Sequence, residues 1–300
     1  MSRVPPKHKQ NLEGLLRLAV EHTGEDAEPA ENLDNIDTQK QEFLHGALQS
    51  MSIDVDKYAL ANLNNDSIST AEKLDCLKII RDDIRDFDTA NSFVKLGYIT
   101  TLLSYIRTPN RDLRPLSIYI VAELAQNNEF CQNYFLNEKL IPVLTSTMND
   151  TDEDLAKGSI LAVSSLVQNF PAGLKEFLRT NGVKQILSCL SSNHSSVYIQ
   201  AAYLIATLSS NDNSFRDLVN KQNAGQILLS ELEAKDEYDF KQEATLYALS
   251  ALSVNSKWKI PSYQRKEATV TLKQIINNKA LADTCEEMIQ YARTVLNTQL

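Results

Sequence analysis

Three sets of residues recur at one helical spacing in this chain and have side chains suited to holding another protein. Each set has one member in each of four short, nearly charge-free stretches, LRPLSIYIVAELAQNN, KGSILAVSSLVQN, QAAYLIATLSSN and YALSALSVN. The first set, the tyrosine column, comprises Tyr119, Leu161, Tyr203 and Tyr247. Four residues on, the middle column comprises Glu123, Ser165, Thr207 and Ala251. Four further on, the asparagine column comprises Asn127, Asn169, Asn211 and Asn255.

The residue types and spacing of these columns predict that they bind another protein. Residues at i, i+4 and i+8 lie on one stripe of a helix. Tyrosine combines a large apolar ring with a hydrogen-bonding tip, which suits it to protein interfaces. A second interpretation is open for two of the columns. The asparagines could instead cap helix ends or bond the backbone of the next turn, and the tyrosines could be half-buried between neighbouring helices.

No group of residues in the sequence points to catalysis, a cofactor or a metal ion. The four histidines, His8, His22, His45 and His194, are scattered, and none stands at ligand spacing with a Cys, Asp or Glu. The glycine motifs that bind phosphate are missing, as are a GxSxG motif and any CxxC pair. We therefore expect a protein that is not an enzyme. The four cysteines lie far apart and are expected to be reduced and mostly buried.

Helical repeats with a period near 42 residues are expected to position the columns. Apolar residues recur at this period in three registers, which are Phe93, Phe135, Phe177 and Val219; Leu102, Leu144, Ile186 and Leu228; and Ile106, Met148, Leu190 and Leu232. The helix-end leucines Leu124, Leu166, Leu208 and Leu252 are spaced 42, 42 and 44 residues apart. This period is typical of HEAT and armadillo repeats, which stack into one continuous core. We predict an all-α fold, a right-handed superhelical solenoid of armadillo-like repeats with a concave binding surface.

The third unit illustrates the internal pattern, which favours one short helix and two longer ones over a helix pair. EDLAKGSILAVSSLVQN predicts one apolar helix, PAGLKEFLRTNG a second with Pro171 near its start, and VKQILSCLSS a third. Gly182 is expected to form a C-terminal cap before the third helix. The connecting segments TPNRD, NDTDED and SSNHSS are rich in turn and N-cap residues.

The chain divides into four predicted segments. Residues 1–40 are expected to form a flexible segment with a short amphipathic helix and an acidic linker, and residues 41–70 to form N-terminal capping helices. Residues 71–255 are predicted to hold the repeats, and residues 256–300 to form two amphipathic capping helices. Residues 257–279 carry six basic side chains and one acidic side chain, a run that could meet an acidic partner or form a solvated face.

Charge and composition limit the partners that are expected. The net charge of −9 disfavours binding to nucleic acid, because most of an acidic surface repels the phosphate backbone. Apolar runs are too short to span a bilayer, and the basic N-terminus is not followed by the apolar stretch of a signal peptide. We therefore expect a cytoplasmic protein. A monomer is expected too, because a capped solenoid needs no second copy to be soluble.

Several motifs, taken in order, carry a family resemblance. NLEGLLRLAV, then an acidic linker, then QEFLHGALQSM, is followed by DFDTANSFVKLGYITTLL with Ala90, Phe93, Gly97 and Leu102. LRPLSIYIVAELAQNN follows, with Leu113, Arg114, Gln126, Asn127 and Asn128. This arrangement resembles the eukaryotic Hsp70-binding protein family, which comprises armadillo-type nucleotide exchange factors of Hsp70 chaperones.

The resemblance implies a mechanism and a partner. The concave face would bind the nucleotide-binding domain of an Hsp70 chaperone and disfavour its closed cleft, so that ADP leaves and the client is released. The residues implied in this contact are Tyr119, Glu123, Asn127, Ser165, Asn169, Tyr203, Thr207, Asn211 and Tyr247. The N-terminal segment would compete at the substrate-binding domain through the apolar side chains of Leu12, Leu15, Leu16 and Leu18.

The middle column favours a folded partner over an extended peptide. Armadillo repeats that thread peptides, as in nuclear import receptors, pair an aromatic residue with an asparagine four residues later. Here the residues at that distance are Glu123, Ser165, Thr207 and Ala251. An armadillo scaffold or transport adaptor without nucleotide exchange activity is the alternative function.

Overall fold

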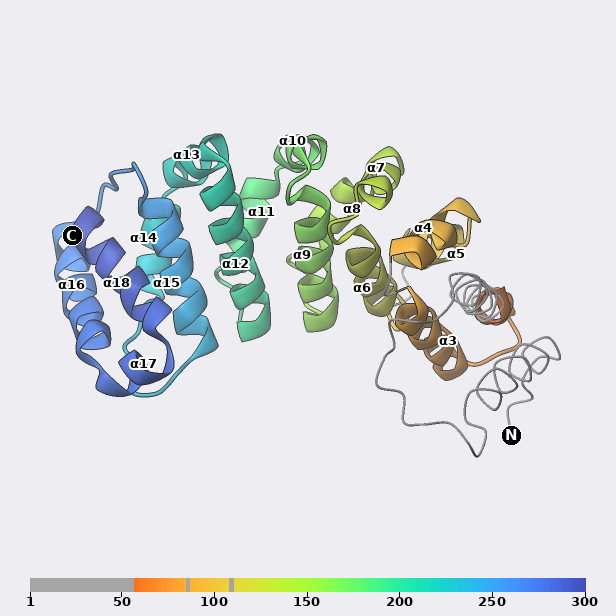
Figure 1. The fold of residues 1–300 in the computed structure, drawn as a ribbon, viewed down its shortest axis with the longest axis horizontal. Coiled ribbons are helices and arrows are strands. Elements are labelled where there is room, and N and C mark those ends of the chain that lie inside the picture. Colours follow the sequence, from red (N-terminus) through yellow and green to blue (C-terminus); the bar gives the residue numbers. More distant parts are fainter. Residues whose placement is uncertain (1–56, 85–86, 108–110) are drawn as a thin grey trace, which may run out of the picture. The chain divides into compact units, whose positions relative to one another are not determined.

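Helices make up all the regular structure of the residues that can be described. The computed structural model describes residues 57–84, 87–107 and 111–300 (Figure 1). In this part of the chain every regular element is a helix, which confirms the all-α prediction. Over the same residues, no helix combines the length and the apolar character that crossing a bilayer requires.

The first of two structural units ends at Tyr105. Its described part contains a helical segment at residues 57–63 and the helices α3 (Thr70–Asp83), α4 (Phe87–Lys95) and α5 (Ile99–Arg107), the last of which runs past the boundary. Ser69 begins α3 with a capping box, in which its hydroxyl accepts from the Glu72 N–H and the Glu72 carboxylate accepts from the Ser69 N–H. Between α4 and α5, Gly97 takes a φ of 76°, which glycine adopts without strain.

The second unit, Ile106–Leu300, is built from repeats of two short helices and one long helix. Its helices are α6 (Arg114–Ala125), α7 (Glu129–Asn137), α8 (Leu140–Thr147), α9 (Glu153–Val167), α10 (Pro171–Arg179), α11 (Gly182–Cys189), α12 (Ser195–Asn211), α13 (Asn213–Lys221), α14 (Ala224–Ser230), α15 (Phe240–Ser253), α16 (Ser262–Asn277), α17 (Lys279–Thr284) and α18 (Glu286–Gln299). The predicted pattern of one short helix and two longer ones is therefore wrong. We call α6, α9, α12, α15 and α18 the long helices, and they pack side by side in that order (Figure 1).

The residues that recur every 42 positions form the core. Every member of the three apolar registers is buried, and so are the four helix-end leucines. Phe93, Phe135 and Phe177 are among the largest fully buried side chains. Burial of one such ring stabilises the fold by about 1.5–3 kcal/mol. The sequence period therefore predicted the interior of the repeats correctly.

Short polar side chains begin many of the helices. Each accepts a hydrogen bond from the backbone N–H three residues later, which satisfies one of the free donors at a helix start. These residues are Asn128, Asp152, Asp212, Asp239 and Asn278. Loss of such a cap costs about 1 kcal/mol. Asp152 belongs to the NDTDED segment, so the prediction of N-cap residues there is confirmed.

The prediction for Gly182 is wrong, and the reason is steric. Asn181, with a φ of 65°, takes the left-handed position after α10, while Gly182 is buried as the first residue of α11. A Cβ atom on Gly182 would lie 2.3 Å from the Phe177 ring. Asparagine tolerates left-handed backbone, so the glycine serves close packing rather than the cap. Pro171 does stand at the first position of α10, as predicted.

The C-terminal residues form three helices rather than the two predicted. Asn278 follows α16 and caps α17, and the non-helical backbone of Cys285 separates α17 from α18. Because α18 packs beside α15, it extends the row of long helices by one member (Figure 1).

Candidate partner-binding face

The predicted columns lie on α6, α9, α12 and α15 and at their C-terminal ends, where the asparagines are the most exposed members. The members of the tyrosine column are half-buried, and so are Glu123, Ser165 and Thr207 of the middle column. Ala251 is buried, at 6% exposure. All four asparagines are exposed. We call this surface the long-helix face, and most of its predicted residues do reach solvent.

The asparagine column has a clear structural role. Asn127, Asn169 and Asn255 have φ values of 54°, 54° and 52°, and each lies just beyond the end of a long helix. Left-handed backbone at this position ends a helix, and asparagine is the residue that most readily replaces glycine there. Asn211 differs, because it is the last residue of α12 itself. The capping interpretation therefore accounts for three of the four asparagines, and their contact with a partner stays a prediction.

The tyrosine column continues onto a residue that the sequence analysis missed. The ring centroids of Tyr203 and Tyr247 are 6.0 Å apart, and those of Tyr247 and Tyr291 are 5.2 Å apart in a stacked arrangement. We call these three residues, which lie on α12, α15 and α18, the tyrosine ladder. Tyr291 follows Tyr247 by 44 residues, the same spacing that separates Tyr203 from Tyr247. That spacing was a usable signal for a fifth member of the column.

A carboxylate lies beside the ladder and was also missed. The hydroxyls of Tyr203 and Tyr238 both donate to Oε2 of Glu243, at 3.0 and 2.6 Å. The hydrogen bond to Glu243, followed by burial, raises the pKa of Tyr238 to about 12. Burial, followed by the hydrogen bond to Glu243, raises the pKa of Tyr203 as well. Both phenols keep their protons at neutral pH, so they act as donors and Glu243 as acceptor. Glu243 precedes Tyr247 by four residues, a spacing that places both on one helix face.

The other half of the face is packed differently. Tyr119 on α6 lies against Gly158 on α9, where an added Cβ would meet the tyrosine ring at 3.3 Å. The next position of the column is Leu161, which has no hydroxyl to offer. The ring contacts of the tyrosine ladder join α12, α15 and α18.

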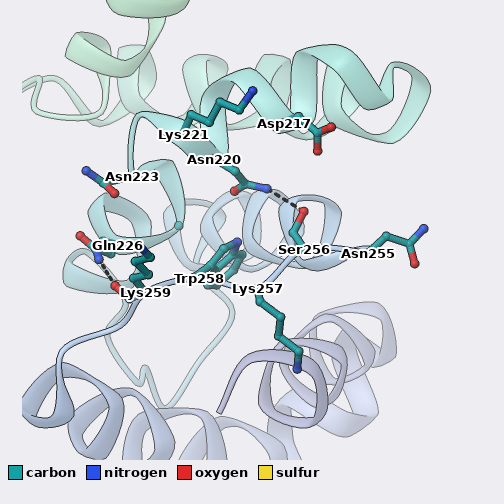
Figure 2. Close-up of a pocket in the computed structure, with 11 residues that line it drawn as sticks. Asp217, Asn220, Lys221, Asn223, Gln226, Asn255, Ser256, Lys257, Trp258 and Lys259 are labelled. Carbon is teal, nitrogen blue, oxygen red and sulfur yellow. Dashed lines mark hydrogen bonds between the residues drawn. The ribbon is translucent and has the colours of Figure 1, made fainter.

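Two hollows open along the asparagine column. One has a volume of about 460 Å³ and lies beside Asn169 and Asn211, with apolar walls from Phe170, Leu174 and Leu208. The other, shown in Figure 2, has a volume of about 480 Å³ and lies beside Asn255 and Asn223. The first could accept an apolar side chain of a partner, whereas the lining of the second is largely polar.

Several polar groups around the second hollow hold the fold together. Asn220 donates to the Ser256 hydroxyl at 3.0 Å, and Gln226 donates to the Lys259 carbonyl (Figure 2). Lys257 donates to the Thr298 carbonyl at 2.6 Å. The Trp258 ring is packed against Gly225, where a Cβ would lie 2.6 Å from it. The hollow is therefore mainly a junction between α13, α14 and the segment that follows α15.

Two members of the basic run serve the fold. Besides Lys257, Arg265 donates to the carbonyls of Gln299 and Leu300 at 2.8 and 3.2 Å. Both side chains thus satisfy carbonyls at the end of α18, where cations are favourable. This favours a structural role for these two residues over contact with an acidic partner.

Three of the four cysteines are buried in the described structure. Cys76, Cys131 and Cys189 are buried free thiols, and burial raises the pKa of Cys131 and of Cys189 to about 12. Such thiols stay protonated and unreactive at neutral pH. Among the described residues, no three His, Cys, Asp or Glu side chains gather into a group that could hold a metal ion.

The N-terminal client-release residues cannot be compared with the structure. Leu12, Leu15, Leu16 and Leu18 lie outside the described residues, as do the acidic linker and the QEFLHGALQSM motif. Their proposed role stays a prediction from the resemblance.

Relatives in sequence carry names that agree with the resemblance. The chain is 27% identical over 174 residues to "Hsp70 nucleotide exchange factor FES1" of Coccidioides immitis (strain RS), covering 55% of this chain and 82% of that protein. It is 24% identical over 196 residues to "Nucleotide exchange factor SIL1" of Xenopus laevis, covering 60% and 42% respectively. It is 23% identical over 225 residues to "Hsp70-binding protein 1" of Homo sapiens, covering 68% and 60%. The match thus spans less than two thirds of the last two proteins. No protein-family model matches the chain.

Solved structures agree on the fold. The designed armadillo repeat protein YIII(Dq)4CqI has a TM-score of 0.63 at 13% identity, covering 80% of this chain and 98% of that one. A second designed armadillo repeat protein, solved in complex with the peptide (KR)4, has a TM-score of 0.60 at 13% identity with the same coverage. At these identities the likeness shows the armadillo fold alone, and the predicted fold class is confirmed.

Proposed function

We propose that this chain is a co-chaperone that acts as an adenyl-nucleotide exchange factor of an Hsp70 chaperone. The observation that carries the proposal is the sequence similarity to proteins named as Hsp70 nucleotide exchange factors and as an Hsp70-binding protein. The armadillo fold supports it, because a solenoid offers an extended surface to a folded partner.

Thermodynamic linkage explains how a nucleotide exchange factor can act without catalysing a chemical step. If the exchange protein lowers the affinity of the chaperone for ADP, then ADP lowers the affinity of the chaperone for the exchange protein by the same ratio. Coupling of about 1–3 kcal/mol changes the affinity about 5- to 150-fold. The long-helix face need only fit one shape of the chaperone better than another.

Three finer parts of the proposal extend beyond the relatives' names. The long-helix face is proposed to bind the nucleotide-binding domain of the chaperone. Residues 1–40, with Leu12, Leu15, Leu16 and Leu18, are proposed to keep released clients from rebinding at the substrate-binding domain. We further propose that the protein acts in the cytoplasm as a monomer.

Release of fluorescently labelled ADP from a purified cytosolic Hsp70 tests the main proposal. Saturating amounts of the full chain should speed release, and an unchanged release rate would exclude nucleotide exchange. Deletion of residues 1–40 should spare ADP release and impair client release. Equal loss of both activities would contradict the separate role of that segment.

Co-precipitation with and without ATP separates this proposal from the adaptor alternative. A nucleotide exchange factor should capture the chaperone and lose it when ATP is added, because ATP and the factor bind in opposition. A scaffold or transport adaptor should capture other proteins and leave the rate of ADP release unchanged.

A further inference from the structure

The tyrosine ladder and Glu243 form one connected cluster on the last three long helices. Tyr247 is stacked on Tyr291 and lies next to Tyr203, whose hydroxyl reaches Glu243. The cluster is extended by Tyr238, which donates to Glu243 from the loop before α15. All members of the ladder and Glu243 itself are half-buried, so the rings and the carboxylate are both partly open to solvent.

Glu243 has acceptor capacity and charge that the described residues leave unused. Both tyrosine hydroxyls bond to Oε2, and no donor in the described part of the chain bonds to Oε1. No lysine, arginine or histidine among these residues forms an ion pair with Glu243. A carboxylate can accept about four hydrogen bonds, so two further bonds are available at Oε1.

The surroundings of the ladder add more negative charge. Glu287 precedes Tyr291 by four residues, as Glu243 precedes Tyr247, so both acids occupy the same position in successive long helices. Burial raises the pKa of Tyr291, and the charges of Glu287 and Glu243 raise it further. This end of the long-helix face therefore joins open aromatic rings to a concentration of carboxylates, which is complementary to a positive charge.

We propose that the cluster of Tyr203, Tyr247, Tyr291 and Glu243 binds an arginine side chain of the partner protein. A guanidinium group is planar, weakly hydrated and able to stack on an aromatic ring while it donates to a carboxylate oxygen. A lysine ammonium is a strongly hydrated point charge and makes less use of the flat ring surface. The identity of the partner as an Hsp70 nucleotide-binding domain rests on the proposed function, whereas the arginine site rests on the cluster itself.

Affinity for the nucleotide-binding domain of a cytosolic Hsp70 provides the first test. Glu243→Gln keeps the shape and an oxygen acceptor for the tyrosines but removes the charge, and should weaken binding about 10-fold. Glu237→Gln removes the same charge from an exposed residue in the loop before α15 and should change affinity less than about twofold. Tyr291→Leu should weaken binding about 10-fold, and Tyr291→Phe, which retains the ring, should stay within about threefold of the unsubstituted protein.

The outcomes separate the arginine site from the proposed function. If the chain speeds ADP release but Glu243→Gln and Glu237→Gln bind alike, the arginine site is wrong and the function stands. If no Hsp70 binds, the proposed function is wrong. Binding of a small arginine derivative then tests the arginine site by itself.

That derivative is N-acetyl-arginine amide, added to the full chain carrying isotope-labelled tyrosine rings and followed by NMR. The signals of Tyr247 and Tyr291 should shift more with this compound than with the lysine or glutamine derivative at equal concentration. Glu243→Gln should reduce the shift. A response to the arginine derivative no larger than that to the other two would overturn the proposal.

Discussion

The two halves of the long-helix face share one scaffold and differ in their chemistry. On α6 and α9, Tyr119 lies against Gly158, and Leu161 interrupts the tyrosine column. On α12, α15 and α18 the tyrosines continue from helix to helix around Glu243. The helix-end leucines are buried in both halves. Because the scaffold is the same, the difference shows that outward positions of a repeat can differ without disturbing the core. We propose that the main partner contact lies in the C-terminal half.

The largest expected difference between the halves is in affinity for the chaperone. Tyr247→Ala removes the central ring of the ladder and should weaken binding about 100-fold, or by about 2.7 kcal/mol, as for the anchor residues of other interfaces. Leu161→Ala, at the matching position of α9, should weaken it about threefold or less. Calorimetric titration with the nucleotide-binding domain measures both values.

Circular dichroism is the control for that pair, because both variants should keep the helical content of the unsubstituted chain. Equal losses of affinity from the Tyr247 and Leu161 substitutions would show that the two halves contribute alike to binding. The proposal that the C-terminal half makes the main contact would then be wrong.

The asparagine column offers a test of stability in both halves at once. Asn169→Ala and Asn255→Ala place alanine in left-handed backbone and should each lower the free energy of unfolding by about 1 kcal/mol. Asn169→Gly and Asn255→Gly should lower it by much less, because glycine adopts this conformation freely. Urea unfolding measures the difference.

Chaperone affinity of the two glycine variants then decides between the interpretations of the column. Unchanged affinity for both means that these asparagines only end helices. A loss of affinity with Asn255→Gly and not with Asn169→Gly would show partner contact confined to the C-terminal half.

The sequence predicted the interior of this protein better than its surface, for a physical reason. The 42-residue period appears in residues such as Phe135 and Phe177, which must be apolar in every copy because each fills the same buried space. Glu243 has no such counterpart, since the equivalent positions in α9 and α12 are Lys157 and Ile199. Its importance depends on Tyr203 of another helix, which spacing along one helix does not show.

The residues at helix ends also show that sequence predicts local contacts better than contacts between helices. Asp152 was predictable, because its hydrogen bond to the Leu155 N–H is local in sequence. Gly182 was misassigned, because its close contact with Phe177 depends on how two helices meet. The fold class could thus be predicted from the repeat period and the solvent-facing columns, apart from the buried Ala251, from helical spacing, while the ladder and its carboxylate required tertiary packing.

Alkaline titration sharpens the comparison within the C-terminal half. The folded-state pKa of Tyr238, about 12, lies above the ordinary value of 10, so folding favours the neutral phenol. The stability that this bond contributes is full below pH 10 and is lost as the pH rises through about 12. Glu243→Gln removes the main cause of the shift and should return the pKa of Tyr238 toward 10, as followed by tyrosinate absorbance. Glu237→Gln is the matched control, and an equal effect from it would mean that general negative charge, not the hydrogen bond, raises the pKa.

The smallest effect is expected at the N-terminal half, from Gly158→Ala. The added methyl group would lie 3.3 Å from the Tyr119 ring, so the ring must move by a few tenths of an ångström. Alanine also favours the helix by up to about 1 kcal/mol, so the free energy of unfolding should change by less than about 1 kcal/mol in either direction. Chaperone affinity should stay within about twofold, because we propose that the partner is anchored on the C-terminal half. If this one methyl group weakened binding as much as Tyr247→Ala, the site would have to include Tyr119, and the partner would have to contact the whole row from α6 to α15.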